Sequence, residues 1–170
     1  MNDYLLYSSP FGDIILSSNS QAITGLRFTG QKYFPQGIPN QIPQIPTSSI
    51  LEDTKNWLDA YCQGRRPSHT LLPLQLSGSE FQLNIWNLLL QIPYGKVVTY
   101  AQLARQYSDA VGIPRMSPQA VGAAVGRNPI SVIVPCHRVI GTSGHLVGYA
   151  AGIETKARLL IHEGYQISNI

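Results

Sequence analysis

The sequence predicts an α+β protein in which a small antiparallel sheet comes first and a mainly helical part follows. Two observations support this order. Short β-branched and aromatic runs separated by turn residues fill the first thirty positions, whereas capped segments with helical apolar spacing dominate after residue 77. We therefore expect two domains, an N-terminal α/β scaffold over residues 1–76 and a C-terminal domain over residues 77–170.

The composition is that of a globular chain without a membrane span. It has 170 residues, 44% of them hydrophobic. No apolar run approaches the roughly 20 residues that a span needs, and the first residues lack the pattern of a signal peptide. We therefore expect no membrane partner and a cytoplasmic location. Cys62 and Cys136 are expected to be reduced, and with four scattered histidines they form no ligand spacing, so we expect neither a metal nor another cofactor.

The excess positive charge lies in the C-terminal half. Residues 1–78 hold five basic and five acidic side chains, whereas residues 79–170 hold seven basic and four acidic ones. This distribution is compatible with a polyanionic partner for the C-terminal half.

The N-terminal half is predicted to hold an antiparallel meander and one helix. The strand-like runs span residues 3–7, 13–18 and 22–28. Residues 34–46 contain four prolines and are expected to form a loop. The stretch that begins Ser48-Ser49 is expected to open a helix with a serine cap, which continues to about residue 62 and stops at Gly64. Cys62, near the end of that helix, is expected to be a partly buried structural thiol.

Four helices are predicted in the C-terminal half. They are expected over residues 81–90, 100–107, 120–126 and 154–162. Thr99 caps the second helix, Ser117 and Pro118 start the third, and Gly164 ends the last. The second and third helices form a pair whose later member has a small-residue side. This pattern fits a helix-turn-helix motif and a plain helical hairpin equally well.

One stretch of the chain indicates chemistry. An apolar run over residues 130–134 leads into Cys136, and His137 and Arg138 follow at once. Pro135 fixes φ and is expected to bend the chain at the cysteine. Nearby cations favour the thiolate, which is the reactive form of cysteine. An inert core cysteine is the alternative, but the two bases beside it favour a nucleophile.

Seven segments between residues 79 and 165 carry a resemblance. They are residues 81–82 with Trp86, 92–95, 99–100 with 103–104, 120–122 with 128–129, 135–140, 148–149 and 162–164. In this order they resemble the O6-alkylguanine-DNA alkyltransferase family, and the Pro-Cys-His-Arg-Val segment is highly specific. The N-terminal half has no comparable motif. The resemblance implies DNA repair in which Cys136 takes and keeps the alkyl (methyl) group of O6-alkylguanine or O4-alkylthymine. Residues 77–170 would then be the alkyltransferase domain.

The resemblance implies a role for each of five catalytic residues. Cys136 would attack the alkyl carbon as a thiolate. His137, oriented by Glu163, would deprotonate the thiol through a bridging water. Tyr100 would donate its hydroxyl to the base near N3, and Asn128 would brace the pocket.

The same resemblance implies that the damaged base leaves the stack, because an alkyl group inside duplex DNA cannot be reached. The base pocket would comprise Tyr149, Val139 and Thr142. The DNA-binding surface would comprise Gln119, Ala120, Gly122, Arg127 and Arg115. The partner would be double-stranded DNA containing O6-alkylguanine, bound by a monomer that is nucleoid-associated in a prokaryote. Arg138 would be mainly structural.

One position departs from the family pattern. The family usually has an arginine directly before the 120–122 segment to fill the gap left by the flipped base, and this chain has Gln119. The segment from Tyr100 to Gln119 is also longer than the family pattern. We therefore expect flipping to survive with weaker or differently balanced DNA affinity.

Two other function classes fit some of the residues. One is a Cys-His hydrolase with repeated turnover, although side chains as close in sequence as Cys136 and His137 rarely point at each other. The other is a helix-turn-helix protein that binds alkylated DNA as a sensor without transfer, and the presence of Cys136 argues against it.

Overall fold

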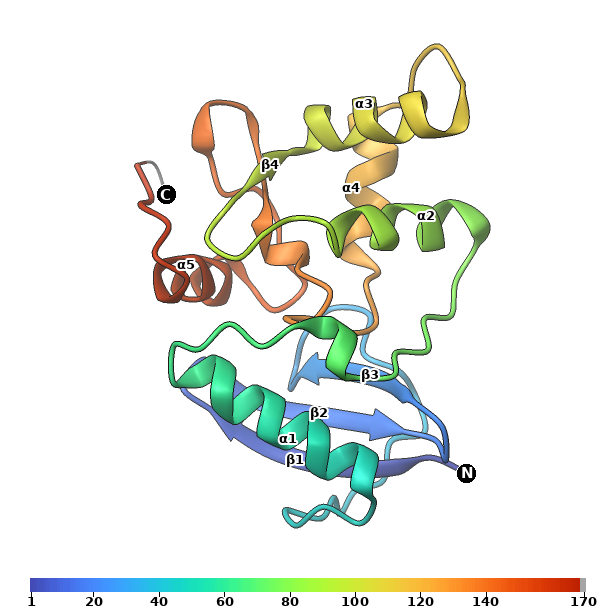
Figure 1. The fold of residues 1–170 in the computed structure, drawn as a ribbon, viewed down its shortest axis with the longest axis vertical. Coiled ribbons are helices and arrows are strands. Elements are labelled where there is room, and N and C mark those ends of the chain that lie inside the picture. The colour runs from blue at the N-terminus through green and yellow to red at the C-terminus, as the bar shows by residue number, and fades with distance from the viewer. Residues whose placement is uncertain (169–170) are drawn as a thin grey trace. The chain divides into compact units, whose positions relative to one another are not determined.

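The computed structural model describes residues 1–168, which divide into two compact units. Unit 1 comprises Met1–Ser77 together with Pro129–Ser131, and unit 2 comprises Gly78–Asn128 and the chain from Val132 onward. Within the described residues, a three-stranded sheet comes first and most of the helices follow it, which confirms the predicted α+β class (Figure 1).

Unit 1 is an antiparallel sheet with one α-helix along it. The sheet has the strand order β1 (Asp3–Ser9), β2 (Gly12–Ser18), β3 (Ile23–Phe28), as the predicted meander requires. Leu5, Leu16 and Leu26 occupy paired positions on the three strands and are all buried. The helix α1 (Ser49–Cys62) buries Trp57 and neighbouring apolar residues, and Figure 1 shows it running along the sheet. Ser48 caps this helix as predicted.

Residues 129–131 return to unit 1 immediately before the cysteine segment. The backbone N–H of Leu26 donates to Pro129, and the N–H of Ser131 donates to Leu26, both over 3.0 Å. The apolar run that follows is buried but forms a turn, because Val132 has a left-handed φ of 70°. The chain therefore leaves extended geometry before Pro135, earlier than the sequence predicts.

Unit 2 is mainly helical. Its α-helices are α2 (Glu80–Leu89), α3 (Tyr100–Val111), α4 (Pro118–Gly126) and α5 (Ile153–His162). Two short strands, β4 (Val98–Thr99) and β5 (Val139–Ile140), pair in parallel. The 3-10 turns are η1 (His69–Leu71) in unit 1, and η2 (Cys136–Arg138) and η3 (Thr142–Gly144) in unit 2.

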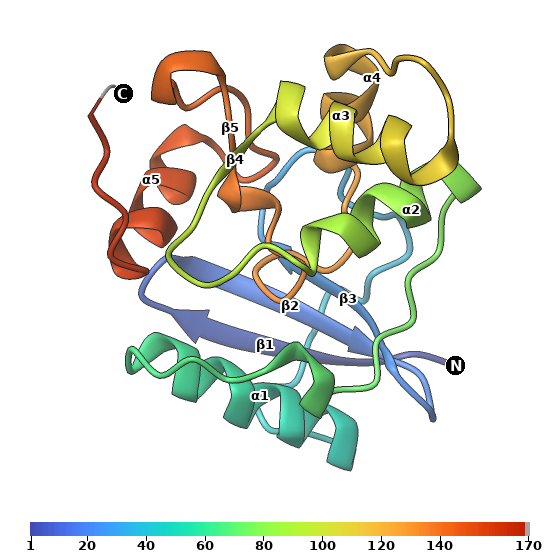
Figure 2. The ribbon, with the colours of Figure 1, turned by 45° about the horizontal axis from the view of Figure 1, so that its top comes forward.

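The helices α2, α3 and α4 pack against one another (Figure 2). The indole N–H of Trp86 on α2 donates to the Ala124 carbonyl on α4 over 2.9 Å. Phe81 on α2 meets Tyr107 on α3 edge to face, with ring centroids 5.0 Å apart. These contacts fix the helix pair α3–α4 on a third helix.

The starts of α3 and α4 agree with the sequence, whereas one end does not. Thr99 and Gln102 form a capping box at α3, and Ser117 caps α4 with Pro118 at its first turn. The helix α3 continues to Val111, past the predicted end at residue 107, and stops at Gly112 with a left-handed φ of 76°. Part of the long segment before α4 is therefore helical.

No helix among residues 1–168 combines the length and apolar character that crossing a membrane requires.

Candidate active site

Cys136 is the first residue of η2 and is only 6% exposed. Its backbone N–H donates to the Val134 carbonyl over 2.8 Å, and the N–H of Arg138 donates to Pro135 over 3.0 Å. The side-chain amide of Asn128 donates to the same Val134 carbonyl over 2.8 Å. Two hydrogen bonds to one carbonyl therefore fix the turn that leads into the cysteine.

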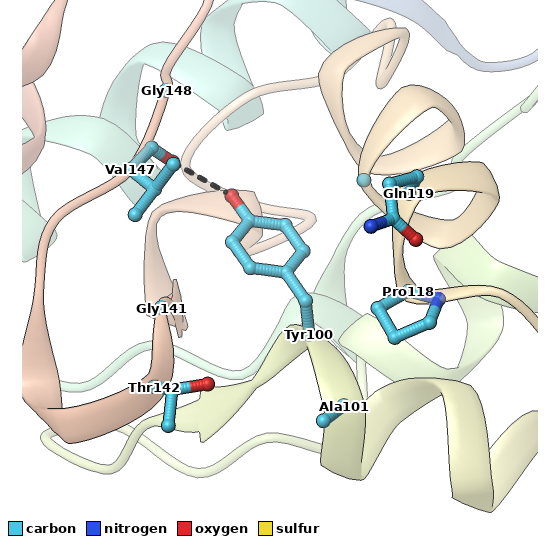
Figure 3. A pocket seen from close by; sticks show the side chains of 9 residues that line it. Tyr100, Ala101, Pro118, Gln119, Gly141, Thr142, Val147 and Gly148 are labelled. Carbon is cyan, nitrogen blue, oxygen red and sulfur yellow. Dashed lines mark hydrogen bonds between the residues drawn. The ribbon is translucent and has the colours of Figure 1, made fainter.

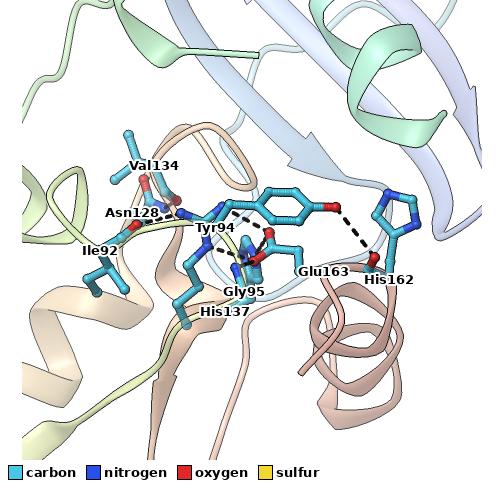
Figure 4. Close-up of polar contacts among 9 residues, drawn as sticks. Ile92, Tyr94, Gly95, Asn128, Val134, His137, His162 and Glu163 are labelled. Carbon is cyan, nitrogen blue, oxygen red and sulfur yellow. Dashed lines mark hydrogen bonds and ion pairs between the residues drawn. The ribbon is translucent and has the colours of Figure 1, made fainter. Parts of the chain in front are cut away.

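The carboxylate of Glu163, directly after α5, is fully buried and accepts hydrogen bonds from three residues (Figure 4). Its Oε1 accepts from His137 Nε2 over 2.7 Å and from Arg138 Nη2 over 3.0 Å. Its Oε2 accepts from Arg138 Nε over 2.8 Å and from the backbone N–H of Gly95 over 3.2 Å. The predicted pair of His137 and Glu163 is therefore in direct contact.

These contacts determine the protonation states of Glu163 and His137. Burial alone raises the pKa of Glu163, but the hydrogen bonds and charges of His137 and Arg138 outweigh it and hold this pKa well below its usual range. Burial lowers the pKa of His137, and Glu163 opposes that shift without cancelling it. At neutral pH the imidazole is therefore uncharged and donates its Nε2–H to an ionised carboxylate. Within residues 1–168, the buried Nδ1 has no hydrogen-bond partner, so it is available as a base.

The turn before β4 supports Glu163 from the other side. The carbonyl of Ile92 accepts from Arg138 Nη1 over 2.6 Å, and the ring of Tyr94 lies 5.7 Å from the Arg138 guanidinium. Gly95 has a left-handed φ of 75°, and a Cβ there would lie 2.9 Å from the Glu163 carbonyl oxygen. This turn therefore requires glycine. The supporting role of Gly95 was not predicted, although its place in a matching segment was a signal.

A cavity of about 570 Å³ opens between α3, α4 and the segment 141–148 (Figure 3). Its lining residues are Tyr100, Ala101, Pro118, Gln119, Gly122, Gly141, Thr142, Val147 and Gly148. The hydroxyl of Tyr100 donates to the Val147 carbonyl over 3.0 Å. Gln119 lies on the α4 side of the Tyr100 ring, and its Oε1 accepts from the Ser117 hydroxyl over 3.0 Å. Burial raises the pKa of Tyr100 to about 12, and the nearby charge of Cys136 adds to the shift.

Other predicted residues lie elsewhere in unit 2. Val139 is fully buried in β5 and Tyr149 is half-buried, and neither lines this cavity. Arg127 caps the end of α4, and Ala120 follows Gln119 on the same helix. Arg115 lines a separate cavity of about 460 Å³ beside the α3–α4 connection. The structure therefore joins Tyr100, Thr142, Gln119 and Gly122 at one cavity.

Sequence reasoning missed Lys156 on α5. Its side chain is fully buried, and its ammonium donates to the Gly148 carbonyl over 3.2 Å and to the Val147 carbonyl over 3.5 Å. Burial lowers the pKa of Lys156 to about 8, although the charge of Cys136 opposes the shift. The signal was its position, since Lys156 falls in the apolar stripe of α5 with Ile153 and Leu160.

Within the described residues, neither cysteine forms a disulfide bond, and no group of three potential ligands is arranged to hold a metal ion. Cys62 is half-buried beside the Tyr7 hydroxyl, at 3.8 Å, and burial raises the pKa of its thiol. Cys62 is therefore the less reactive type of thiol.

Lowering the pH from 7.5 to 5 is expected to reduce the free energy of unfolding. The folded-state pKa of His137 lies below its ordinary value of 6.5, so the unfolded chain binds the proton first. The contribution of His137 is complete above that value and declines as the pH falls toward the folded pKa. One histidine accounts for at most about 1.4 kcal/mol per pH unit. Glu163, whose folded pKa is also depressed, adds a loss only below its ordinary value of 4.5.

Urea unfolding at a series of pH values measures this slope. A His145→Gln variant, changed at an exposed histidine, should keep the slope of the original chain. A free energy of unfolding that stays constant or rises between pH 7.5 and 5 would contradict a neutral, buried His137.

A capped helix pair beside a buried Cys-His-Glu group defines a candidate cysteine transferase with a helical nucleic-acid-binding part. Two family models match the chain. Residues 3–76 match the ribonuclease-like domain of 6-O-methylguanine DNA methyltransferase, and residues 80–165 match its DNA binding domain. The chain belongs to this family, as the seven sequence segments predict.

Individual relatives agree along almost the whole chain. A methylated-DNA–protein-cysteine methyltransferase of Mycobacterium leprae is 40% identical over 159 residues, covering 94% of this chain and 90% of the relative. A protein of the same name from Methanosarcina acetivorans is 37% identical and covers 95% and 97%. The crystal structure of Mycobacterium tuberculosis OGT in complex with DNA has a TM-score of 0.79 at 37% identity, covering 95% of this chain and 92% of that chain.

Proposed function

We propose that this chain repairs alkylated DNA by moving the alkyl group from O6 of guanine to Cys136, once per molecule. The thiolate sulfur attacks the alkyl carbon, a sulfur–carbon bond forms and the carbon–O6 bond breaks. The electron pair stays on the base, which takes up a proton. The observation that carries the proposal is the buried hydrogen bond between Glu163 and His137, the residue that follows the buried Cys136. Its support is membership of a family whose relatives are named for transfer to a protein cysteine.

The proton of the thiol would leave through His137. The imidazole is neutral, and its Nε2–H is held by Glu163, so Nδ1 is the nitrogen left to accept a proton. We infer that a bridging water carries the proton from Cys136 to Nδ1. Glu163 then stabilises the imidazolium, and Arg138 keeps Glu163 ionised.

The base would enter the cavity beside Tyr100 after leaving the duplex. A cavity of about 570 Å³ is of the size that holds small ligands. Tyr100 would donate its hydroxyl to the base near N3, while Thr142, Val139 and Tyr149 form the pocket and its support. Asn128 would brace the cysteine turn through Val134. O4-alkylthymine is a second substrate of the same chemistry.

The DNA would meet the helix pair α3–α4. We infer that α4 presents Gln119, Ala120 and Gly122 to the duplex, with Arg127 and Arg115 near the phosphates. Gln119 would fill the gap that the base leaves. The protein would act as a monomer on double-stranded DNA in the cytoplasm, at the nucleoid in a prokaryote. Residues 77–170 would carry the transfer, and residues 1–76 would serve as the scaffold.

Gln119→Arg is expected to tighten DNA binding about three- to tenfold at low salt, because it adds one positive charge close enough to a DNA phosphate to neutralise it. The slope of log affinity against log salt should steepen by about one. Fluorescence anisotropy with an O6-methylguanine duplex measures both quantities.

Gln21→Arg is the matched control, since it adds the same charge at an exposed glutamine of unit 1. Equal DNA affinity and equal transfer rate in the original chain and Gln119→Arg would show that Gln119 does not occupy the gap.

Stoichiometry tests the proposed function. With a fixed amount of protein and excess O6-methylguanine duplex, the repaired guanine should plateau at one per protein molecule. Repeated turnover would favour a hydrolase, and tight binding without repair would favour a sensor.

A further inference from the structure

Lys156 is a buried lysine beside the cavity. Within residues 1–168, no carboxylate lies within ion-pair distance of the Lys156 ammonium, although its side chain is fully buried. An ammonium in such a place is unfavourable unless its hydrogen bonds are made. Lys156 donates instead to two backbone carbonyls, those of Gly148 and Val147. Its position is therefore tied to the segment that forms one wall of the cavity.

The Val147 carbonyl accepts a second hydrogen bond, from Tyr100 on α3. The hydroxyl of Tyr100 donates to it over 3.0 Å, a shorter contact than the 3.5 Å from Lys156 (Figure 3). The ammonium also lies 5.7 Å from the centroid of the Tyr100 ring. Two helices, α3 through Tyr100 and α5 through Lys156, thus hold one backbone oxygen.

This sharing matters because the proposed reaction needs the Tyr100 hydroxyl elsewhere. A hydroxyl has one proton to donate, so Tyr100 must release Val147 before it can donate to a base. An ammonium has three protons to donate. Lys156 can therefore strengthen its bond to Val147 without giving up Gly148.

We propose that Lys156 is a positioning residue that keeps the Val147–Gly148 wall in place when the Tyr100 hydroxyl turns from Val147 to the bound base. The proposal rests on the proposed function, because it assigns the Tyr100 hydroxyl to the base during transfer. It predicts that the two donors back each other up, so that the wall loosens only when both are lost.

Amide hydrogen exchange of residues 146–149 tests this back-up without DNA. Tyr100→Phe alone should change the exchange rates less than about threefold, because Lys156 still holds Val147. In a Lys156→Met background, the same Tyr100→Phe change should raise them about tenfold or more, because the Val147 carbonyl is then left without either donor. An equal effect of Tyr100→Phe in both backgrounds would overturn the proposal, whatever the protein does to DNA.

Single-turnover transfer from an O6-methylguanine duplex is the second test. At saturating DNA, Lys156→Met should transfer about tenfold more slowly or worse, whereas Lys55→Met, changed at a surface lysine of α1, should match the original chain. Lys156→Met should fold, since an apolar side chain of similar length in place of a buried charge is often neutral or stabilising. If the original chain transfers and Lys156→Met transfers equally fast, the positioning role is wrong. If the original chain does not transfer, the proposed function itself fails.

A third experiment separates the positioning role of Lys156 from an effect of its charge on the Cys136 thiol. Iodoacetamide alkylates a thiolate without needing the cavity wall, and peptide mapping distinguishes Cys136 from Cys62. At a pH where the thiol is fully ionised, the rate at Cys136 should differ less than about threefold between Lys156→Met and the original chain. A loss there as large as the loss of transfer would overturn the positioning role.

Discussion

Cys136→Ser is expected to abolish alkyl transfer while leaving the fold intact. The serine hydroxyl is similar in size to the thiol but does not ionise near neutral pH, so the nucleophile is lost and the buried turn is kept. Removing the nucleophile of a covalent mechanism typically lowers the rate by more than about a thousandfold. A duplex with a labelled O6-methyl group, followed by counting of protein-bound label, measures the loss.

Cys62→Ser is the matched control for this change. Its thiol is half-buried at the end of α1, and burial raises its pKa, so its loss should leave transfer at the original rate. Transfer by Cys136→Ser within tenfold of the original chain would contradict the assignment of the nucleophile. So would loss of transfer in Cys62→Ser.

Glu163→Gln is expected to destabilise the protein by about 3–5 kcal/mol, because it leaves the Arg138 guanidinium without its charge partner in a buried place. The neutral amide also presents an N–H₂ group to neighbours that are themselves donors, namely His137, Arg138 and the Gly95 backbone. His137 then loses the acceptor that sets its tautomer. We therefore expect transfer to fall by at least about a hundredfold even where the variant remains folded.

Urea unfolding and single-turnover transfer at a temperature below the melting transition measure the two effects separately. Glu154→Gln is the matched control, since Glu154 is exposed in the first turn of α5, the helix that Glu163 directly follows. A change there should stay within about 0.5 kcal/mol. If Glu163→Gln is as stable as Glu154→Gln and equally active, Glu163 has neither the structural nor the chemical role given to it.

The sequence predicts those features of the fold that depend on neighbouring residues. Ser48, Thr99 and Ser117 cap their helices as predicted, because a cap is a contact between residues three positions apart. The strand meander follows from alternating runs and turns in the same way. The predicted end of α3 at residue 107 was wrong, because the residue that stops the helix, Gly112, lies five positions further along the chain.

The same distinction applies to the site, where features of adjacent residues could be predicted and contacts made only by the fold could not. The adjacency of Cys136 and His137 is visible in the sequence, but Glu163 was named only through the family resemblance, since the fold alone brings it to His137. Lys156 lies in the apolar stripe of α5, which is a signal of burial, but a lysine on a helix is usually exposed. Its carbonyl partners lie only eight and nine residues earlier, in a loop whose path the sequence does not predict. The same holds for the hydrogen bond between Tyr100 and Val147.

Peptide mapping by mass spectrometry, after mixing the protein with an O6-methylguanine duplex, locates the transferred methyl group. We predict one added methyl group per protein molecule, on the peptide that contains Cys136, with the DNA left carrying unmodified guanine. A repaired duplex with no methyl group on Cys136, or a methyl group on Cys62 instead, would contradict it.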